Sequence, residues 1–147
     1  IAGTLFVLPG EQIHIVTKGA GGPVEVFRFP SGSELGPDVP IDSVPVLELV
    51  QVLDEGRRAL PRQVTGASTS PSGTHVAIRT YETLAFYRVD AGELVAREPL
   101  VNLRFVAENQ GEAVGWGPGS RVALTSEAGP FGSRGSFSVL ECRVPGA

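Results

Sequence analysis

Three segments of the chain align as copies of one unit, and this repeat limits the folds that the sequence can adopt. Each copy has a short apolar run that ends at a proline, a glycine-containing turn, a second run of alternating apolar and polar residues, and a third such run. The first runs end at Pro9, Pro71 and Pro118, the second cover residues 12–18, 75–81 and 121–127, and the third cover residues 24–29, 84–89 and 137–142. Antiparallel strands that recur every roughly 45–60 residues are typical of propeller blades. The sequence therefore predicts an all-β fold of three blades with three or four antiparallel strands each.

The repeats span about residues 1–62, 63–108 and 109–147, which we interpret as one half-propeller domain. Residues 47–53 and 94–103 predict a fourth strand in the first two repeats, and the third repeat lacks one because it ends soon after Cys142. Residues 47–60 have a helical alternative, since Leu47, Val50 and Leu53 would share one helical face. Residues 31–45 hold three prolines and predict a loop.

Composition indicates a globular domain and argues against nucleic acid and membrane as partners. The chain has 147 residues, of which 41% are hydrophobic and 19% charged, as in globular domains that bury a core. Its formal charge of −4, with Arg57-Arg58 as the only adjacent basic pair, argues against a nucleic-acid partner. No apolar run reaches the roughly 20 residues of a membrane helix, so we expect no membrane insertion. No secretory leader is visible, and the start at Ile1 without methionine suggests a processed or trimmed piece.

Three blades do not close a ring, because propellers carry four to eight. An open stack would expose two apolar blade faces, and the missing fourth strand would leave an unpaired edge. We therefore expect a homodimer with six blades, or a complementary propeller half as partner. Because a propeller blade is covered on both faces, we expect apolar residues on both faces of its strands to be buried between blades. These residues are Ile13, Ile15, Val26, Phe27, Val76, Ile78, Phe86, Val122, Leu124 and Val139.

Three sets of segments carry a resemblance to a known group of proteins. They are residues 16–19 with 24–29, residues 64–73 leading to 76–81, and residues 110–116 leading to 125–127. Their order resembles the C-terminal three blades of bacterial, secreted β-propeller proteins of the phytase-like, TolB-like or WD-repeat-like type. The resemblance implies a secreted or periplasmic location and further blades before this region. The group tends to carry acidic residues in its first strands, where this chain has Gly3 and Ser68, so a cation site would be depleted here.

Five polar residues are candidates for a ligand site. Aligning the repeats places Lys18, Tyr81 and Glu127 at one position, the end of the second strand. Arg79 lies two residues before Tyr81 and so shares its face, and Glu112 lies on a first strand, near the ring axis. A cluster of both signs at a channel mouth suits a small polar or phosphate-bearing ligand. The alternative is that these charges are satisfied by one another or by water.

Evidence for metal binding and catalysis is weaker. Calcium takes six to eight oxygens, whereas Glu112 and Glu127 are two carboxylates, with Glu82 and Asp90 elsewhere along a blade. We expect no cofactor, with calcium as the alternative. The sequence has no Gly-x-Ser-x-Gly elbow, and the glycine-rich residues 129–135 lack the lysine of a phosphate loop.

The remaining candidate residues have simpler interpretations. His14 and His75 lack metal-ligand spacing and are interpreted as core or edge residues, Cys142 as a small buried residue, and Trp116 as filling between blades. The sequence thus favours a non-catalytic binding or assembly module, with no catalytic residue assigned. The alternative is a cation-dependent hydrolase of the phytase-like type, a phosphoesterase or esterase.

Overall fold

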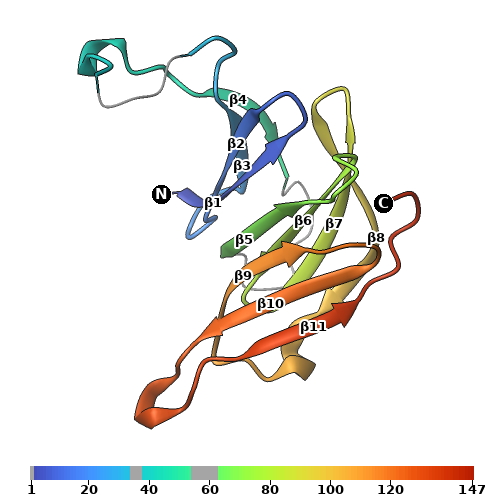
Figure 1. The fold of residues 1–147 in the computed structure, drawn as a ribbon. Coiled ribbons are helices and arrows are strands. Elements are labelled where there is room, and N and C mark those ends of the chain that lie inside the picture. Colours follow the sequence, from blue (N-terminus) through green and yellow to red (C-terminus); the bar gives the residue numbers. More distant parts are fainter. Residues whose placement is uncertain (1, 34–37, 54–62) are drawn as a thin grey trace.

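The computed structural model describes residues 2–33, 38–53 and 63–147, which form three antiparallel sheets (Figure 1). The first sheet has the order β1 (Ala2–Leu8), β2 (Gln12–Thr17), β3 (Glu25–Arg28) and β4 (Glu48–Val52). The second has the order β5 (Val64–Thr69), β6 (His75–Thr80), β7 (Thr83–Asp90) and β8 (Glu93–Asn102). The third has the order β9 (Gln110–Trp116), β10 (Arg121–Glu127) and β11 (Phe137–Glu141). Three antiparallel sheets of three or four strands confirm the predicted fold class.

The repeated turns are hairpin turns between the first and second strands of each sheet. Each holds one glycine at positive φ, which is 79° at Gly10, 74° at Gly73 and 65° at Gly119. Glycine adopts this left-handed conformation at no steric cost because it has no Cβ. The preceding prolines end the first strands, so the ladder loses no hydrogen bond to them.

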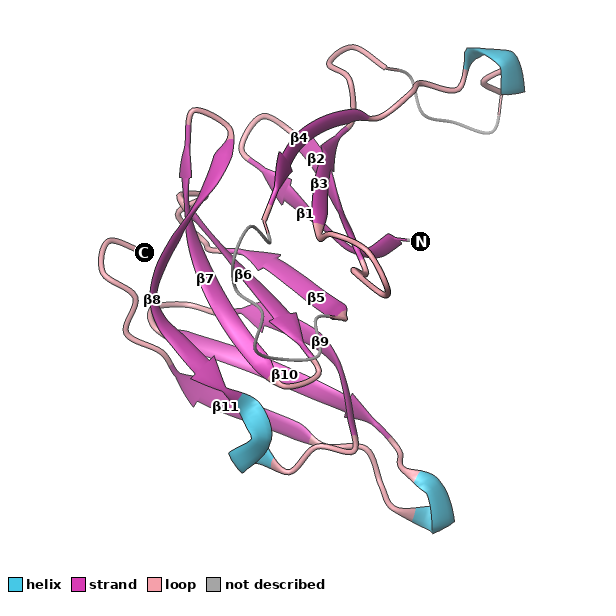
Figure 2. Ribbon diagram, turned by 180° about the vertical axis from the view of Figure 1, so that it is seen from behind, coloured by secondary structure: helices cyan, strands magenta, loops and turns pink. Residues whose placement is uncertain are grey.

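The sheets stack face to face, with the first strand of each innermost (Figure 2). β1 contacts β5, β5 contacts β9, and on the outside β4 contacts β8. A Cβ at Gly66 of β5 would lie 2.9 Å from the backbone nitrogen of Val114 of β9, so glycine permits this close approach. On the outside, the Gln51 amide donates to Leu94 O at 2.9 Å and accepts from Leu94 N at 2.8 Å.

Two apolar clusters fill the spaces between neighbouring sheets. Val26, Val76 and Ile78 belong to the cluster between the first and second sheets. Phe86, Val122 and Leu124 belong to the cluster between the second and third sheets. The prediction of burial is confirmed for these six residues.

The prediction of burial is wrong for Val139, which is 56% exposed, and it holds only in part for Ile13, Ile15 and Phe27, which are half-buried. All four lie on the outward faces of the two terminal sheets. Pairing places Leu5, Ile15, Phe27 and Leu49 in one row across β1 to β4. Because no blade covers these faces within the described part of the chain, their apolar residues contact solvent.

The remaining elements are short. Turns of 3₁₀ helix cover η1 (Ile41–Ser43), η2 (Leu103–Val106) and η3 (Pro130–Gly132). β4 and β8 confirm the predicted fourth strands, so the helical alternative is wrong over residues 48–52, while residues 54–60 lie outside the described part. Among the residues described, no helix is long and apolar enough to span a membrane.

Candidate functional site

A row of polar side chains crosses the three sheets where their second strands end. Lys18 follows β2, and its Nζ lies 5.6 Å from the centroid of the Tyr81 ring, within the range of a cation–π contact. Tyr81 follows β6, and its hydroxyl accepts a hydrogen bond of 3.3 Å from Gln110 Nε2. Gln110 begins β9 and pairs with Glu127 at the end of β10. We call this row, Lys18, Tyr81, Gln110 and Glu127, the polar rim.

The polar rim follows from the repeat. Lys18, Tyr81 and Glu127 were aligned by sequence, and the structure brings Lys18 and Tyr81 into contact and connects Tyr81 to the Glu127 strand through Gln110. The sequence alignment missed Gln110, because it lies at the start of a first strand. A signal was available, since residues that begin β9 must lie opposite residues that end β10 in an antiparallel pair.

Glu112 lies near this row on β9, in a stretch where the pairing with β10 is irregular. Ser126 pairs with Gly111 and Thr125 with Ala113, so Glu112 occupies a bulge between them. Its side chain is half-buried and forms no hydrogen bond or ion pair with the other described residues. The structure thus places one half-buried and one exposed carboxylate, Glu112 and Glu127, on adjacent strands of the third sheet.

Arg79 does not lie on the exposed rim, because it is 0% exposed and its guanidinium lies between the second and third sheets. Its Nη2 lies 2.7 Å from Oε2 of Glu108, whose side chain is 3% exposed. Its Nη1 donates to the carbonyl oxygens of Ala113 at 3.2 Å and Thr125 at 3.3 Å. One residue of β6 is therefore bound to both β9 and β10, and we call it the Arg79 clamp.

Nothing in the repeat pattern indicates Glu108, and Gly111 explains how the Arg79 guanidinium fits between the sheets. A Cβ at Gly111 would collide with the Arg79 guanidinium, so only glycine leaves the space that this group fills. A buried arginine needs a counter-charge and hydrogen-bond acceptors, and Glu108 with two carbonyls provides them. Oε1 of Glu108 is buried without a partner in the described residues.

The two histidines and the cysteine are core residues, as the sequence predicts. His14 is 1% exposed and stacks on Phe6 with ring centroids 4.9 Å apart, and His75 is 2% exposed. Burial lowers the pKa of both imidazoles, and nearby arginines lower the pKa of His75 further. Burial raises the pKa of the Cys142 thiol, which favours the unreactive neutral form.

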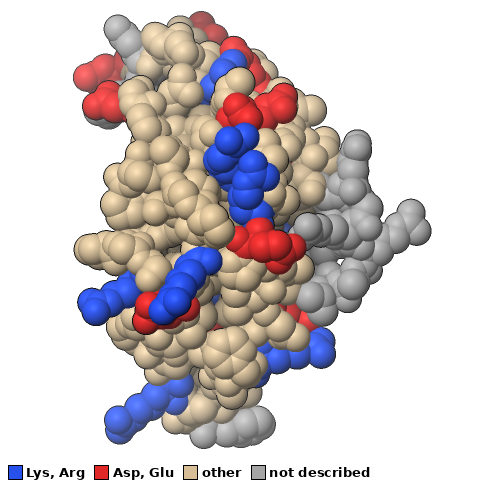
Figure 3. All heavy atoms as spheres, turned by 90° about the vertical axis from the view of Figure 1, so that its right-hand side faces the viewer, with Lys and Arg blue, Asp and Glu red and all other residues tan. Residues whose placement is uncertain are grey.

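Charged groups on the surface are mixed in sign. On the face seen in Figure 3, basic side chains lie beside acidic ones, without a large area of one sign. Exposed ion pairs include Arg28 with Glu48 and Arg88 with Asp90, each at 2.6 Å. In the ranges that the structure describes, no three His, Cys, Asp or Glu residues are grouped to hold a metal ion.

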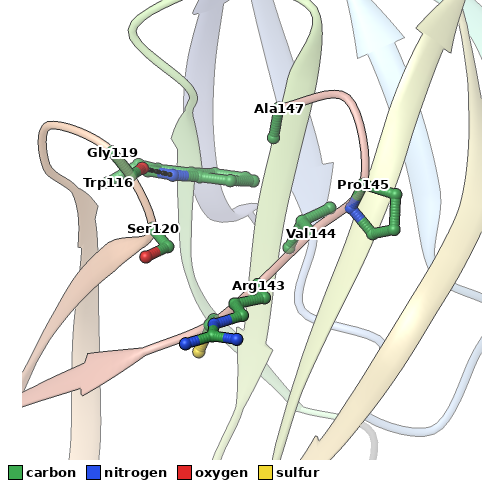
Figure 4. Close-up of a pocket in the computed structure, with 8 residues that line it drawn as sticks. Trp116, Gly119, Ser120, Arg143, Val144, Pro145 and Ala147 are labelled. Carbon is green, nitrogen blue, oxygen red and sulfur yellow. Dashed lines mark hydrogen bonds between the residues drawn. The ribbon is translucent and has the colours of Figure 1, made fainter.

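Trp116 fills space between the second and third sheets, as predicted. Its ring meets Phe86 edge-on at 5.2 Å, and its backbone N–H donates to Ser68 Oγ at 2.8 Å. It also forms one wall of a pocket of about 320 Å³ between the β9–β10 turn and the segment after β11 (Figure 4). The pocket is lined by Trp116, Gly119, Ser120, Cys142, Arg143, Val144, Pro145 and Ala147. None of the five predicted ligand-binding residues lines it.

Comparison with known proteins bears on the fold. No family model matches the chain. No curated protein matches it in sequence. Among solved structures, it is similar to the crystal structure of the Cps50 (Swd1) β-propeller domain from Myceliophteria thermophila, with a TM-score of 0.54 and 15% identity. The match covers 97% of this chain and 41% of the other.

The fold is that of part of a β-propeller. The chain spans about two-fifths of the length of the propeller domain that it matches. A likeness at 15% identity concerns the fold alone, and fold does not determine function. The bacterial origin, the secreted location and the phytase-like or TolB-like relationship therefore stay predictions.

Proposed function

We propose that the chain is a non-catalytic propeller segment whose function is assembly, and that two copies complete a six-bladed ring. The supporting observation is the pair of uncovered apolar faces at the two ends of the stack. On the first sheet, Leu5 is 57%, Val7 45% and Leu49 55% exposed. On the third sheet, Phe137 is 69% and Val139 56% exposed. Contiguous apolar patches of this kind mark interaction sites.

The two faces fit a head-to-tail contact. Within the chain, the side of β10 that carries Val122 and Leu124 packs on the second sheet, so Ala123 and Thr125 face outward. Within the first sheet, the inward residues include Phe6 and Val16, so the row containing Leu5 faces outward. The outward face of the third sheet of one copy would thus meet the outward face of the first sheet of the next. Such contacts form a ring when the rotation closes.

Light scattering at micromolar concentration tests the assembly. We expect a mass of two chains, with each contact burying about 800 Å² per partner. Leu5→Glu introduces a charge on the outward face and should give a single chain. Leu100→Glu is the matched control, because Leu100 is 46% exposed but lies on β8, away from both terminal faces. A folded wild-type protein with the mass of one chain would contradict the proposal.

The ring would carry two copies of the polar rim and of the neighbouring Glu112, and we propose that they form a site for a small polar or phosphate-bearing ligand. Lys18, Tyr81, Glu112 and Glu127 would contact the ligand, with Arg79 beneath them. Inorganic phosphate is a suitable probe: it should raise the melting temperature, and Lys18→Gln should abolish the increase. Lys18→Arg keeps the charge and is the control. An equal increase in the Lys18→Gln variant would show that phosphate acts elsewhere.

A further inference from the structure

The outer edge of β11 has no neighbouring strand within the described residues. In the first two sheets the corresponding position is filled, by β4 beside β3 and by β8 beside β7. Edge strands are usually protected from further pairing by lysine, proline or a bulge. β11 reads Phe-Ser-Val-Leu-Glu, with neither lysine nor proline, and its pairing with β10 is regular. The backbone N–H and C=O groups on the outer edge of β11 can therefore form hydrogen bonds with an added extended segment.

A second exposed feature lies in the connection between β3 and β4. We call residues 38–47, the described part of this connection that directly precedes β4, the arm. It extends from the first sheet away from the other two sheets, and Figures 1 and 2 show this from opposite sides. Two of its valines are exposed, Val44 at 58% and Val46 at 86%. The arm thus holds apolar surface in solvent at the end of the stack opposite to β11 of the same chain.

The sequence of the arm suits an outermost strand. In an extended segment Val44 and Val46 point to one side of the sheet, while Pro45 and Leu47 point to the other. The backbone groups of Val44 and Val46 also share one edge, and those of Pro45 face the opposite edge. If Val44 and Val46 pair with β11, the missing N–H of Pro45 faces solvent, which is where proline is tolerated in sheets.

We propose that the arm of one copy adds the missing fourth strand to the third sheet of a second copy, with Val44 and Val46 beside Phe137 and Val139. This rests on the proposed head-to-tail ring, in which the third sheet of one copy lies against the first sheet of the next. The arm leads directly into β4, the outer strand of the first sheet, and β11 is the outer strand of the third sheet. Exchange of a segment in this way buries both exposed features at once.

Disulfide cross-linking tests the contact directly. In the Val46→Cys/Val139→Cys variant, Cys at position 46 of one copy would lie opposite Cys at position 139 of the other, on adjacent strands. Side chains in this arrangement are close enough to form a disulfide. We expect a covalent dimer on a non-reducing gel. Leu100→Cys/Val139→Cys is the matched control and should remain monomeric on the gel. The single native cysteine, Cys142, is buried and serves as the background in the wild-type chain.

A second pair separates this inference from the ring itself. Leu5→Cys/Ala123→Cys places cysteines on the two outward faces and should cross-link if the faces meet. Cross-linking of this pair without cross-linking of Val46→Cys/Val139→Cys would overturn the arm contact and leave the ring. Failure of both pairs, with the mass of one chain, would overturn both proposals.

Dimer dissociation gives an independent measure. Val46→Asp should raise the dissociation constant of the dimer about tenfold or more, because it places a charge where an apolar side chain is buried. Leu100→Asp should change it by less than about twofold. Equal effects of the two substitutions would overturn the proposed role of the arm.

Discussion

The Arg79 clamp allows a quantitative test of how the second and third sheets are held together. Arg79→Met keeps much of the side-chain volume and removes the charge and all the donors of the guanidinium. Glu108 would then be a buried carboxylate without a counter-charge, and the carbonyls of Ala113 and Thr125 would each lose a donor. Removing one partner of a buried ion pair costs about 3–5 kcal/mol. At about 2–4 °C per kcal/mol, the melting temperature should fall by about 6–20 °C.

Two further variants separate the effect of the buried charge from that of a lost ion pair in general. Arg79→Met/Glu108→Leu removes both charges, and an apolar pair in place of a buried ion pair is often neutral or stabilising. The double variant should therefore recover most of the stability that Arg79→Met loses. Arg88→Met is the control, because Arg88 and Asp90 form an ion pair of 2.6 Å with side chains 45% and 57% exposed. Its cost should stay at or below about 1 kcal/mol.

Trp116 provides the assay, since it is the single tryptophan and packs on Phe86 across the same interface. Its fluorescence in a urea titration should report separation of the second and third sheets. A loss below about 1 kcal/mol for Arg79→Met would refute the reasoning, as would a double variant no more stable than Arg79→Met. Either result would mean that the Arg79–Glu108 pair has no net effect on the interface.

The remaining predictions concern the apolar residues between and outside the sheets. Ile78→Ala should cost about 2–5 kcal/mol in denaturant melts, because Ile78 is 4% exposed in the cluster between the first and second sheets. Val139→Ala should cost less than about 1 kcal/mol in a single chain, because Val139 is 56% exposed. In an assembled ring the cost of Val139→Ala should rise with protein concentration, whereas that of Ile78→Ala should not. A loss below about half a kcal/mol for Ile78→Ala would contradict its place in the core.

The strands were predictable from sequence because two independent signals agree at most of them. Alternating apolar residues mark the second strands, and the glycines at positive φ mark the turns before them. Residues 31–45 were predicted only as a loop, because their three prolines disfavour a long strand or helix and carry no information about the direction of the segment. The exposure of Val139 was missed because a fully covered strand and a strand at the end of a stack have the same apolar pattern.

Position along a strand was easier to predict than the surroundings of a side chain. The alignment placed Lys18 and Tyr81 at equivalent strand ends, and the two side chains meet because those ends lie on neighbouring sheets. The same alignment pairs Arg79 with Val16 in the first repeat and with Thr125 in the third. Val16 lies in the cluster between the first and second sheets, so this position of the repeat faces the next sheet.

Arg79 is therefore best understood as a core residue whose charge is compensated locally. Its burial depends on two residues outside its own strand, since Gly111 leaves the space and Glu108 provides the counter-charge. Neither Val16 nor Thr125 would need such partners, so the pair is specific to the contact between the second and third sheets. A charged residue in a repeat can bind a ligand or fix two blades to each other. The choice between these roles depends on residues far away in the sequence, which alignment of the repeats does not place.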